Sequence, residues 1–197
     1  KIALGTVQFG LDYGISNKGG QVEPAEVFRI LAHAREMGVR TLDTAAAYGN
    51  SEQLIGDFHR ETGIEFDVVS KLPAKTSRAG AEEALDKCLH DLGCEALAGY
   101  LAHDFETLKN PEVWDFFKQA KESGRVRKIG VSLYRPEEAL WILERGLAPD
   151  IIQFPFSVFD QRFRSVLGPC REAGIELHAR SIFLQGLYFL NPSMLPD

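Results

Sequence analysis

The segment PAEVFRILAHAREMGVRTLDTA, residues 24–45, carries the pattern that decides the fold. Its first part has the spacing of an amphipathic helix, because apolar residues recur every three or four positions. Gly38 then supplies a residue that tolerates the left-handed conformation in which many helices end. The apolar run after it, residues 39–45, predicts a strand. The helix is expected to bury one face made of Val27, Ile30, Leu31, Ala34 and Met37.

This helix, turn and strand unit recurs along the chain. An amphipathic stretch ends in a glycine, and an apolar run follows, at Gly38, Gly63, Gly93, Gly124, Gly146 and Gly174. Pro24, Pro111 and Pro136 stand where the first turn of a helix tolerates a missing N–H. Nearly continuous apolar strands that alternate with helices indicate parallel strands in an α/β protein. With the opening run, the expected strands are 2–7, 39–45, 66–72, 96–103, 126–133, 150–156 and 175–181.

Two α/β architectures fit this alternation: an open doubly wound sheet and a (β/α)8 TIM barrel. The even spacing of the units, and the absence of a GxGxxG segment after any strand, favour the barrel. Residues 1–197 are therefore expected to form a single barrel domain with about seven of its eight units. The chain starts at Lys1 and ends in LNPSMLPD after the seventh strand, so we expect it to be a C-terminally incomplete part of a longer protein.

Composition and charge restrict the partners that the protein is expected to bind. The chain has 22 Lys and Arg against 28 Asp and Glu, which gives a net charge of −6. This sign is unfavourable for nucleic acid and for anionic membranes. No apolar run approaches the roughly 18 residues that a membrane span needs, and the N-terminus lacks a signal-peptide pattern. These features predict a soluble cytoplasmic protein.

The sequence contains no pattern typical of a metal site or of nucleophilic catalysis. Cys88, Cys94 and Cys170 form no CxxC pair, and their odd number argues against a disulfide framework. Neither HxH nor HExxH spacing occurs, so we expect no metal site. No GxSxG segment is present either, and no serine is assigned a nucleophilic role.

Four protonatable residues fall at or just after the ends of predicted strands, where barrel active sites are built. They are Asp43, Tyr48, Lys71 and His103. A buried Lys71 needs a carboxylate to compensate for its desolvation, and Asp43 on the neighbouring strand is within reach. The resulting ammonium is expected to lower the pKa of Tyr48 and make it a proton donor. A neutral His103 could donate a hydrogen bond to a carbonyl oxygen.

Each of the four residues also has a purely structural explanation. Asp43 could cap a helix, Tyr48 could be a solvent-facing loop residue, Lys71 could reach the surface, and His103 could be a hydrogen-bonded residue at a strand end. Their occurrence together on consecutive strand ends favours the catalytic interpretation.

In this order, Asp43, Tyr48, Lys71 and His103 resemble the catalytic tetrad of the aldo-keto reductases, and LDTAAAYGNSE, residues 42–52, resembles the best-known motif of that family. GTVQFG, GVS and IIQFPFSVFDQR resemble other family motifs. The resemblance covers residues 1 to about 187 and implies a TIM-barrel oxidoreductase. The cofactor contacts that it implies are Gly5, Thr6, Asp43, Ser132, Gln153, Arg180, Ser181, Gln185, Gly186 and Leu187.

Two positions depart from the family pattern. Leu133 follows GVS where the family usually has Asn, and Arg180 replaces the aromatic residue that stacks on the nicotinamide. An Arg guanidinium can also lie flat on an aromatic ring. The resemblance implies NADP(H) as cofactor, with NAD(H) as the alternative.

The sequence therefore predicts carbonyl reduction: hydride transfer from NAD(P)H to an aldehyde or ketone, with Tyr48 as the proton donor. The expected partner is a small carbonyl or alcohol substrate. One alternative is a nicotinamide-binding regulatory or sensor subunit with little turnover. A second is a chain that binds no cofactor, because the eighth unit that grips the phosphate is missing.

Overall fold

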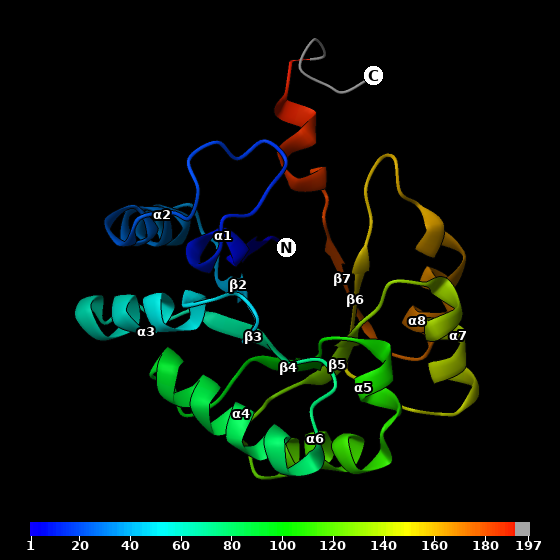
Figure 1. Cartoon of the computed structure of the whole chain (residues 1–197). Coiled ribbons are helices and arrows are strands. Elements are labelled where there is room, and N and C mark those ends of the chain that lie inside the picture. Colours follow the sequence, from blue (N-terminus) through cyan, green and yellow to red (C-terminus); the bar gives the residue numbers. More distant parts are fainter. Residues whose placement is uncertain (192–197) are drawn as a thin grey trace.

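The computed structural model describes residues 1–191, and its centre is a curled sheet of seven parallel strands (Figure 1). The strands are hydrogen-bonded in the order in which they occur in the chain. This confirms the predicted α/β architecture, with about seven units of a (β/α)8 barrel. Among the described residues, no strand pairs with the outer edge of the first or the last strand. The strands are β1 (Ala3–Gly5), β2 (Thr41–Asp43), β3 (Asp67–Leu72), β4 (Gly99–Ala102), β5 (Ile129–Ser132), β6 (Ile151–Pro155) and β7 (Glu176–Arg180).

Helices connect successive strands and surround the sheet on its outer side (Figure 1). None of the helices within residues 1–191 combines the length and the apolar character needed to cross a membrane. The α-helices are α1 (Val7–Gly10), α2 (Pro24–Glu36), α3 (Ser51–Thr62), α4 (Arg78–Leu92), α5 (Phe105–Lys109), α6 (Pro111–Glu122), α7 (Pro136–Glu144) and α8 (Leu167–Glu172). Two 3-10 helices are η1 (Arg162–Val166) and η2 (Leu184–Phe189).

The predicted helix boundaries are confirmed where local chemistry sets them. Proline occupies the first turn of α2, α6 and α7. Gly63 and Gly93 end α3 and α4 in the left-handed conformation, with φ of 68° and 65°. One expectation for α2 is wrong: Met37 lies beyond the last helical residue and its side chain is 71% exposed, whereas Val27 and Leu31 are fully buried.

Two apolar clusters follow from the alternation of side chains along the strands. The larger one lies between the sheet and the helices and includes Tyr100 and Phe117, whose ring centroids are 5.6 Å apart. The smaller one consists of Val69, Leu101 and Ile151, and it faces the inside of the curled sheet. Lys71 comes two residues after Val69 on β3, so its side chain points to the same inner face.

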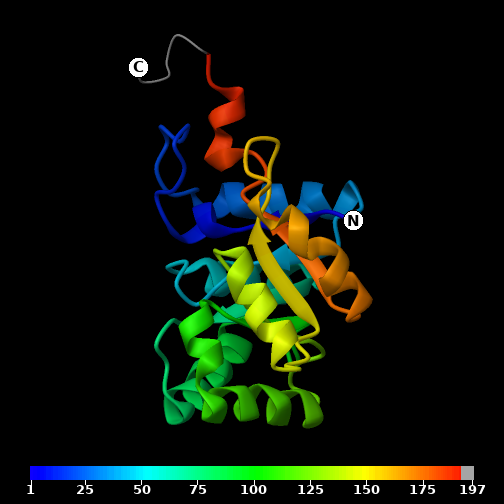
Figure 2. The ribbon, with the colours of Figure 1, turned by 90° about the vertical axis from the view of Figure 1, so that its right-hand side faces the viewer.

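The carboxyl ends of the strands meet at one end of the molecule. The η2 segment and the loop after α1 lie at this end in both views (Figures 1 and 2). The Ser16 hydroxyl donates to the Gln185 carbonyl at 3.2 Å and links the two segments. The end of the predicted C-terminal loop, residues 192–197, lies outside the described residues.

Candidate active site

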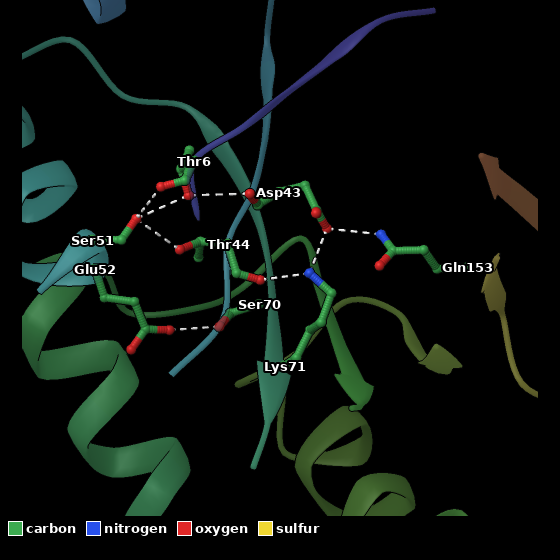
Figure 3. Close-up of polar contacts among 8 residues, drawn as sticks. All are labelled: Thr6, Asp43, Thr44, Ser51, Glu52, Ser70, Lys71 and Gln153. Atoms are coloured by element: carbon green, nitrogen blue, oxygen red, sulfur yellow. Dashed lines mark hydrogen bonds and ion pairs between the residues drawn. The ribbon is translucent and has the colours of Figure 1, made fainter. Parts of the chain in front are cut away.

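Lys71 is the most deeply buried charged side chain of the site, with 1% of its side chain exposed. Its Nζ lies 2.8 Å from Asp43 Oδ1 and donates a second hydrogen bond to the Thr44 carbonyl at 2.7 Å (Figure 3). The predicted contact between Lys71 and Asp43 is thus present. A carboxylate and a carbonyl together compensate for much of the cost of desolvating the ammonium.

Asp43 ends β2 and also accepts a hydrogen bond from the opposite side of the barrel. Gln153 Nε2 on β6 donates to Asp43 Oδ1 at 2.8 Å (Figure 3). Since β2 and β6 are not neighbours in the sheet, this bond crosses the barrel interior. One carboxylate oxygen therefore joins Lys71 and Gln153.

Tyr48 is held by a turn that packs closely against α1, and a glycine on each side of the contact, Gly49 in the turn and Gly10 at the end of α1, allows this approach. A Cβ on Gly10 would collide with the Tyr48 carbonyl oxygen, and one on Gly49 would collide with the Gly10 carbonyl oxygen. Gly49 also has a φ of 57°, which other residues rarely adopt. The turn between β2 and α3 therefore requires glycine at both contact points, and it fixes the direction of Tyr48.

The Tyr48 ring lies beside the side chains of Lys71 and His103. Lys71 Nζ is 5.2 Å from the centroid of the Tyr48 ring. The His103 ring meets the Tyr48 ring edge to face, with centroids 6.1 Å apart. The structure thus brings the four predicted residues to one rim of the barrel.

Burial changes the protonation equilibria at this rim. It raises the pKa of Tyr48 above its ordinary value, and the nearby Asp43 carboxylate adds to this rise. The pKa of Tyr48 is therefore raised and not lowered as expected, because desolvation of the phenolate outweighs the positive charge of Arg180, which acts in the opposite direction. Burial lowers the pKa of Lys71, and the Asp43 carboxylate opposes this change.

Burial also lowers the pKa of His103, and the positive charge of Lys71 lowers it further. His103 is therefore neutral at pH 7, as the predicted hydrogen-bond donor requires. The ring stays neutral in the folded protein over a range in which an unfolded chain, with an ordinary histidine pKa of about 6.5, already takes up a proton.

This difference predicts a loss of stability in acid that depends on His103. Below pH about 6.5 the unfolded state binds more protons than the folded state, so the free energy of unfolding falls with pH until the lower folded pKa is passed. A His103→Gln variant should lose less stability between neutral and acidic pH than the wild type. Urea unfolding at both pH values measures the difference. His33→Gln, at an exposed histidine on α2, should behave like the wild type. An equal acid loss in wild type and His103→Gln would contradict the prediction.

Three buried hydroxyl groups behind Asp43 and Lys71 were not predicted as site residues in this role. Thr6, Thr44 and Ser51 are each fully buried. Ser51 Oγ lies 2.9 Å from Thr6 Oγ1 and 3.1 Å from Thr44 Oγ1 (Figure 3). Thr6 was expected near the nicotinamide, but its hydroxyl donates to the Asp43 carbonyl at 3.1 Å. The position of Ser51 three residues after Tyr48, at the start of a helix, was the available signal in the sequence.

The other predicted cofactor contacts on strand ends lie at the same rim. Gly5 ends β1 and is paired in register with Asp43. Ser132 ends β5 and is buried. Arg180 ends β7, and its guanidinium lies 4.3 Å from the centroid of the Tyr134 ring, so an aromatic residue of the chain itself occupies one face of this cation. Leu133 is buried, and its carbonyl accepts a long hydrogen bond of 3.5 Å from Arg180.

The remaining predicted contacts follow β7 and lie farther along the chain. Ser181 has a φ of 58° and accepts a 3.4 Å hydrogen bond from Arg180. Gln185, Gly186 and Leu187 lie in η2, which packs against the loop after α1 through Ser16. The η2 segment is therefore held by the loop after α1, and not by the hydrogen bonds that join Lys71, Asp43 and Gln153.

Comparison with known proteins bears out the resemblance. The profile of the aldo/keto reductase family matches residues 1–191. The chain belongs to this family. An aldo-keto reductase from a Mycobacterium species is 34% identical over 140 residues, which cover 68% of this chain and 50% of that protein. This chain spans about half the length of such curated relatives.

Solved structures of the same family share the fold. The aldo/keto reductase of Brucella melitensis superposes with a TM-score of 0.71 at 26% identity, covering 92% of this chain and 68% of that one. An aldo-keto reductase of Bombyx mori, solved in complex with NADP, superposes with a TM-score of 0.72 at 26% identity, covering 91% of this chain and 62% of that one.

Proposed function

We propose that this family member reduces an aldehyde or ketone to an alcohol with NAD(P)H, and that Tyr48 donates the proton. The observation that supports this proposal most directly is the buried Lys71–Asp43 ion pair beside the Tyr48 ring, with Nζ 2.8 Å from Oδ1. A charged pair that is expensive to bury, placed next to a tyrosine and a neutral histidine at the carboxyl ends of barrel strands, is typical of a catalytic site. The proposed partner is a small carbonyl or alcohol compound.

The residues present fit a nicotinamide cofactor. Gln153 Oε1 is buried and has no hydrogen-bond partner among the described residues. A buried acceptor without a partner is costly, and the N–H group of a nicotinamide carboxamide would satisfy it. Ser132, which ends β5, and Gln153, its register partner in the middle of β6, would hold that carboxamide. The Bombyx mori neighbour solved with NADP supports NADP(H) as the cofactor, with NAD(H) as the alternative.

The protein's own residues would handle the proton and the carbonyl oxygen. The bound cofactor would supply hydride to the carbonyl carbon. Because its pKa is raised by burial, Tyr48 stays protonated at neutral pH and is ready to donate. An alkoxide is a stronger base than a phenolate, so the transfer becomes favourable as negative charge develops on the substrate oxygen. Neutral His103 would donate a hydrogen bond to the same oxygen, and the Lys71 ammonium beside the Tyr48 ring would stabilise the phenolate that forms.

Steady-state oxidation of NADPH and NADH with a panel of aldehydes and ketones tests the proposal. Turnover that depends on the carbonyl compound supports a reductase. Tight cofactor binding without turnover of any compound in the panel would overturn the proposal and favour the sensor. The absence of cofactor binding in a fluorescence titration would overturn both.

A further inference from the structure

The buried hydroxyl groups of Thr6, Thr44 and Ser51 form a connected set beside Asp43 and Lys71 (Figure 3). We propose that Ser51 is a positioning residue that holds both Lys71 and Tyr48 in their catalytic arrangement. The proposal rests on the proposed function, since it concerns the geometry of that site. Ser51 contacts neither reacting group through its own side chain and acts through their hydrogen-bonding partners.

Counting protons gives the hydroxyl set a single direction. The one proton of Thr6 Oγ1 is used on the Asp43 carbonyl, at 3.1 Å. Ser51 must therefore donate toward Thr6, whose Oγ1 is 2.9 Å away and whose carbonyl is 3.1 Å away. Thr44 Oγ1, at 3.1 Å, is then the donor to Ser51 Oγ. Ser51 is the only member that both donates and accepts within the set, so removing its hydroxyl interrupts the chain in the middle.

Both ends of this series of hydrogen-bonded hydroxyl groups belong to residues that hold Lys71 or its partner Asp43. The Thr44 carbonyl accepts from Lys71 Nζ at 2.7 Å, so the orientation of Thr44 determines one of the two acceptors of the ammonium. The Asp43 carbonyl is held by the hydroxyl and the backbone N–H of Thr6, and the Asp43 carboxylate is the second acceptor. Hydrogen bonds in a buried chain strengthen one another, so the loss of the central hydroxyl weakens both supports.

The backbone of Ser51 is hydrogen-bonded to that of Tyr48. Its N–H donates to the Tyr48 carbonyl at 3.0 Å and closes the turn that carries the tyrosine. Ser51 also begins α3, so a shift of this residue changes the turn on one side and the hydroxyl set on the other. A displacement of about 1 Å in a catalytic group can cost roughly 100-fold in rate.

Ser70 provides a matched control. It is also fully buried, and it precedes Lys71 on β3, but its hydroxyl donates to Glu52 Oε1 at 2.5 Å on the outer face of the sheet. Ser70→Ala and Ser51→Ala each remove one buried hydroxyl group. Only Ser51→Ala removes a hydroxyl group that is linked to the acceptors of Lys71, and it keeps the backbone N–H that donates to the Tyr48 carbonyl.

The test compares Ser51→Ala, Ser70→Ala and Tyr48→Phe in the full chain, with a carbonyl compound that the wild type reduces. We expect Ser51→Ala to lower kcat by about 10- to 100-fold with little change in cofactor affinity, and to shift the pH profile of kcat. Ser70→Ala should keep both kcat and the pH profile. Thr44→Val, which removes only the first donor of the chain, should change kcat in the same direction by less.

The outcomes separate the two proposals. If Tyr48→Phe keeps full turnover, the proposed function fails. If Tyr48→Phe is inactive but Ser51→Ala and Ser70→Ala have equal kcat and equal pH profiles, the role of Ser51 is overturned while the function stands. A crystal structure of Ser51→Ala gives a readout independent of activity: Lys71 Nζ should move away from the Thr44 carbonyl, and an unchanged 2.7 Å contact would contradict the proposal.

Discussion

Tyr48→Phe should lower kcat for carbonyl reduction by about 10²- to 10⁴-fold, because it removes only the hydroxyl group of the proposed proton donor. The phenyl ring keeps the edge-to-face contact with His103 and the position beside Lys71 Nζ. The turn is set by Gly10 and Gly49, which the substitution does not touch. We therefore expect an unchanged fold and nearly unchanged affinity for NADPH, measured by circular dichroism and fluorescence titration beside steady-state kinetics.

Tyr134→Phe is the control for this loss. Tyr134 follows β5, is 51% exposed and stacks with Arg180, so the variant also removes one hydroxyl from a tyrosine at the rim. It should retain most of the wild-type kcat. Equal losses of kcat in the two variants would show that the loss does not depend on which tyrosine hydroxyl is removed. Full activity of Tyr48→Phe would exclude Tyr48 as the proton donor.

Asp43→Asn should reduce the free energy of unfolding by about 3–5 kcal/mol, because it leaves the buried Lys71 ammonium without its carboxylate. Asparagine keeps the shape of the side chain and can still accept from Lys71 and Gln153, so the change isolates the charge. Burial already lowers the pKa of Lys71, and loss of the opposing carboxylate should lower it further. The variant should also lose most of its turnover. Urea unfolding and kcat on the same preparation measure both effects.

The double variant Asp43→Asn with Lys71→Met is the control for the buried charge. Replacing the ammonium by an apolar side chain removes the uncompensated charge, so much of the lost stability should return while activity does not. If the double variant is no more stable than Asp43→Asn, the instability does not come from the unpaired ammonium. Equal stability of Asp43→Asn and the wild type would contradict the assignment of this ion pair as a strong interaction.

The sequence predicts the strands of this fold well, because each is a nearly continuous apolar run between glycine-ended helices. The sequence also predicts that Asp43, Lys71 and His103 lie at one rim, since the carboxyl ends of parallel strands meet there. Strand limits are less well predicted: the run at 39–45 becomes a strand of only Thr41–Asp43, although the Thr44 N–H still donates to the Val69 carbonyl on β3.

Other features depend on quantities that the sequence does not contain. The pKa of Tyr48 follows the balance of burial and charge, and burial outweighs the positive charge of Arg180. The bond from Gln153 to Asp43 joins strands that are not neighbours, so it requires the actual curvature of the sheet. The sequence analysis assigns Ser51 no nucleophilic role because no GxSxG segment is present, and the positioning role proposed for it requires the three hydroxyl groups to be seen together.

The side chains of the tetrad all come from one continuous stretch of the chain, Asp43 to His103, whereas the residues expected at the cofactor begin mainly at Ser132. A chimera with a recombination crossover between His103 and Ser132 would therefore take all four proposed acid–base residues from one parent. One contact would cross between the two parental halves, because Gln153 in the second half donates a hydrogen bond to Asp43 in the first. Chimeras of this family should tolerate such exchanges of their second halves when a glutamine is retained at that position. This offers a route to a new cofactor preference without redesign of the proposed proton donor.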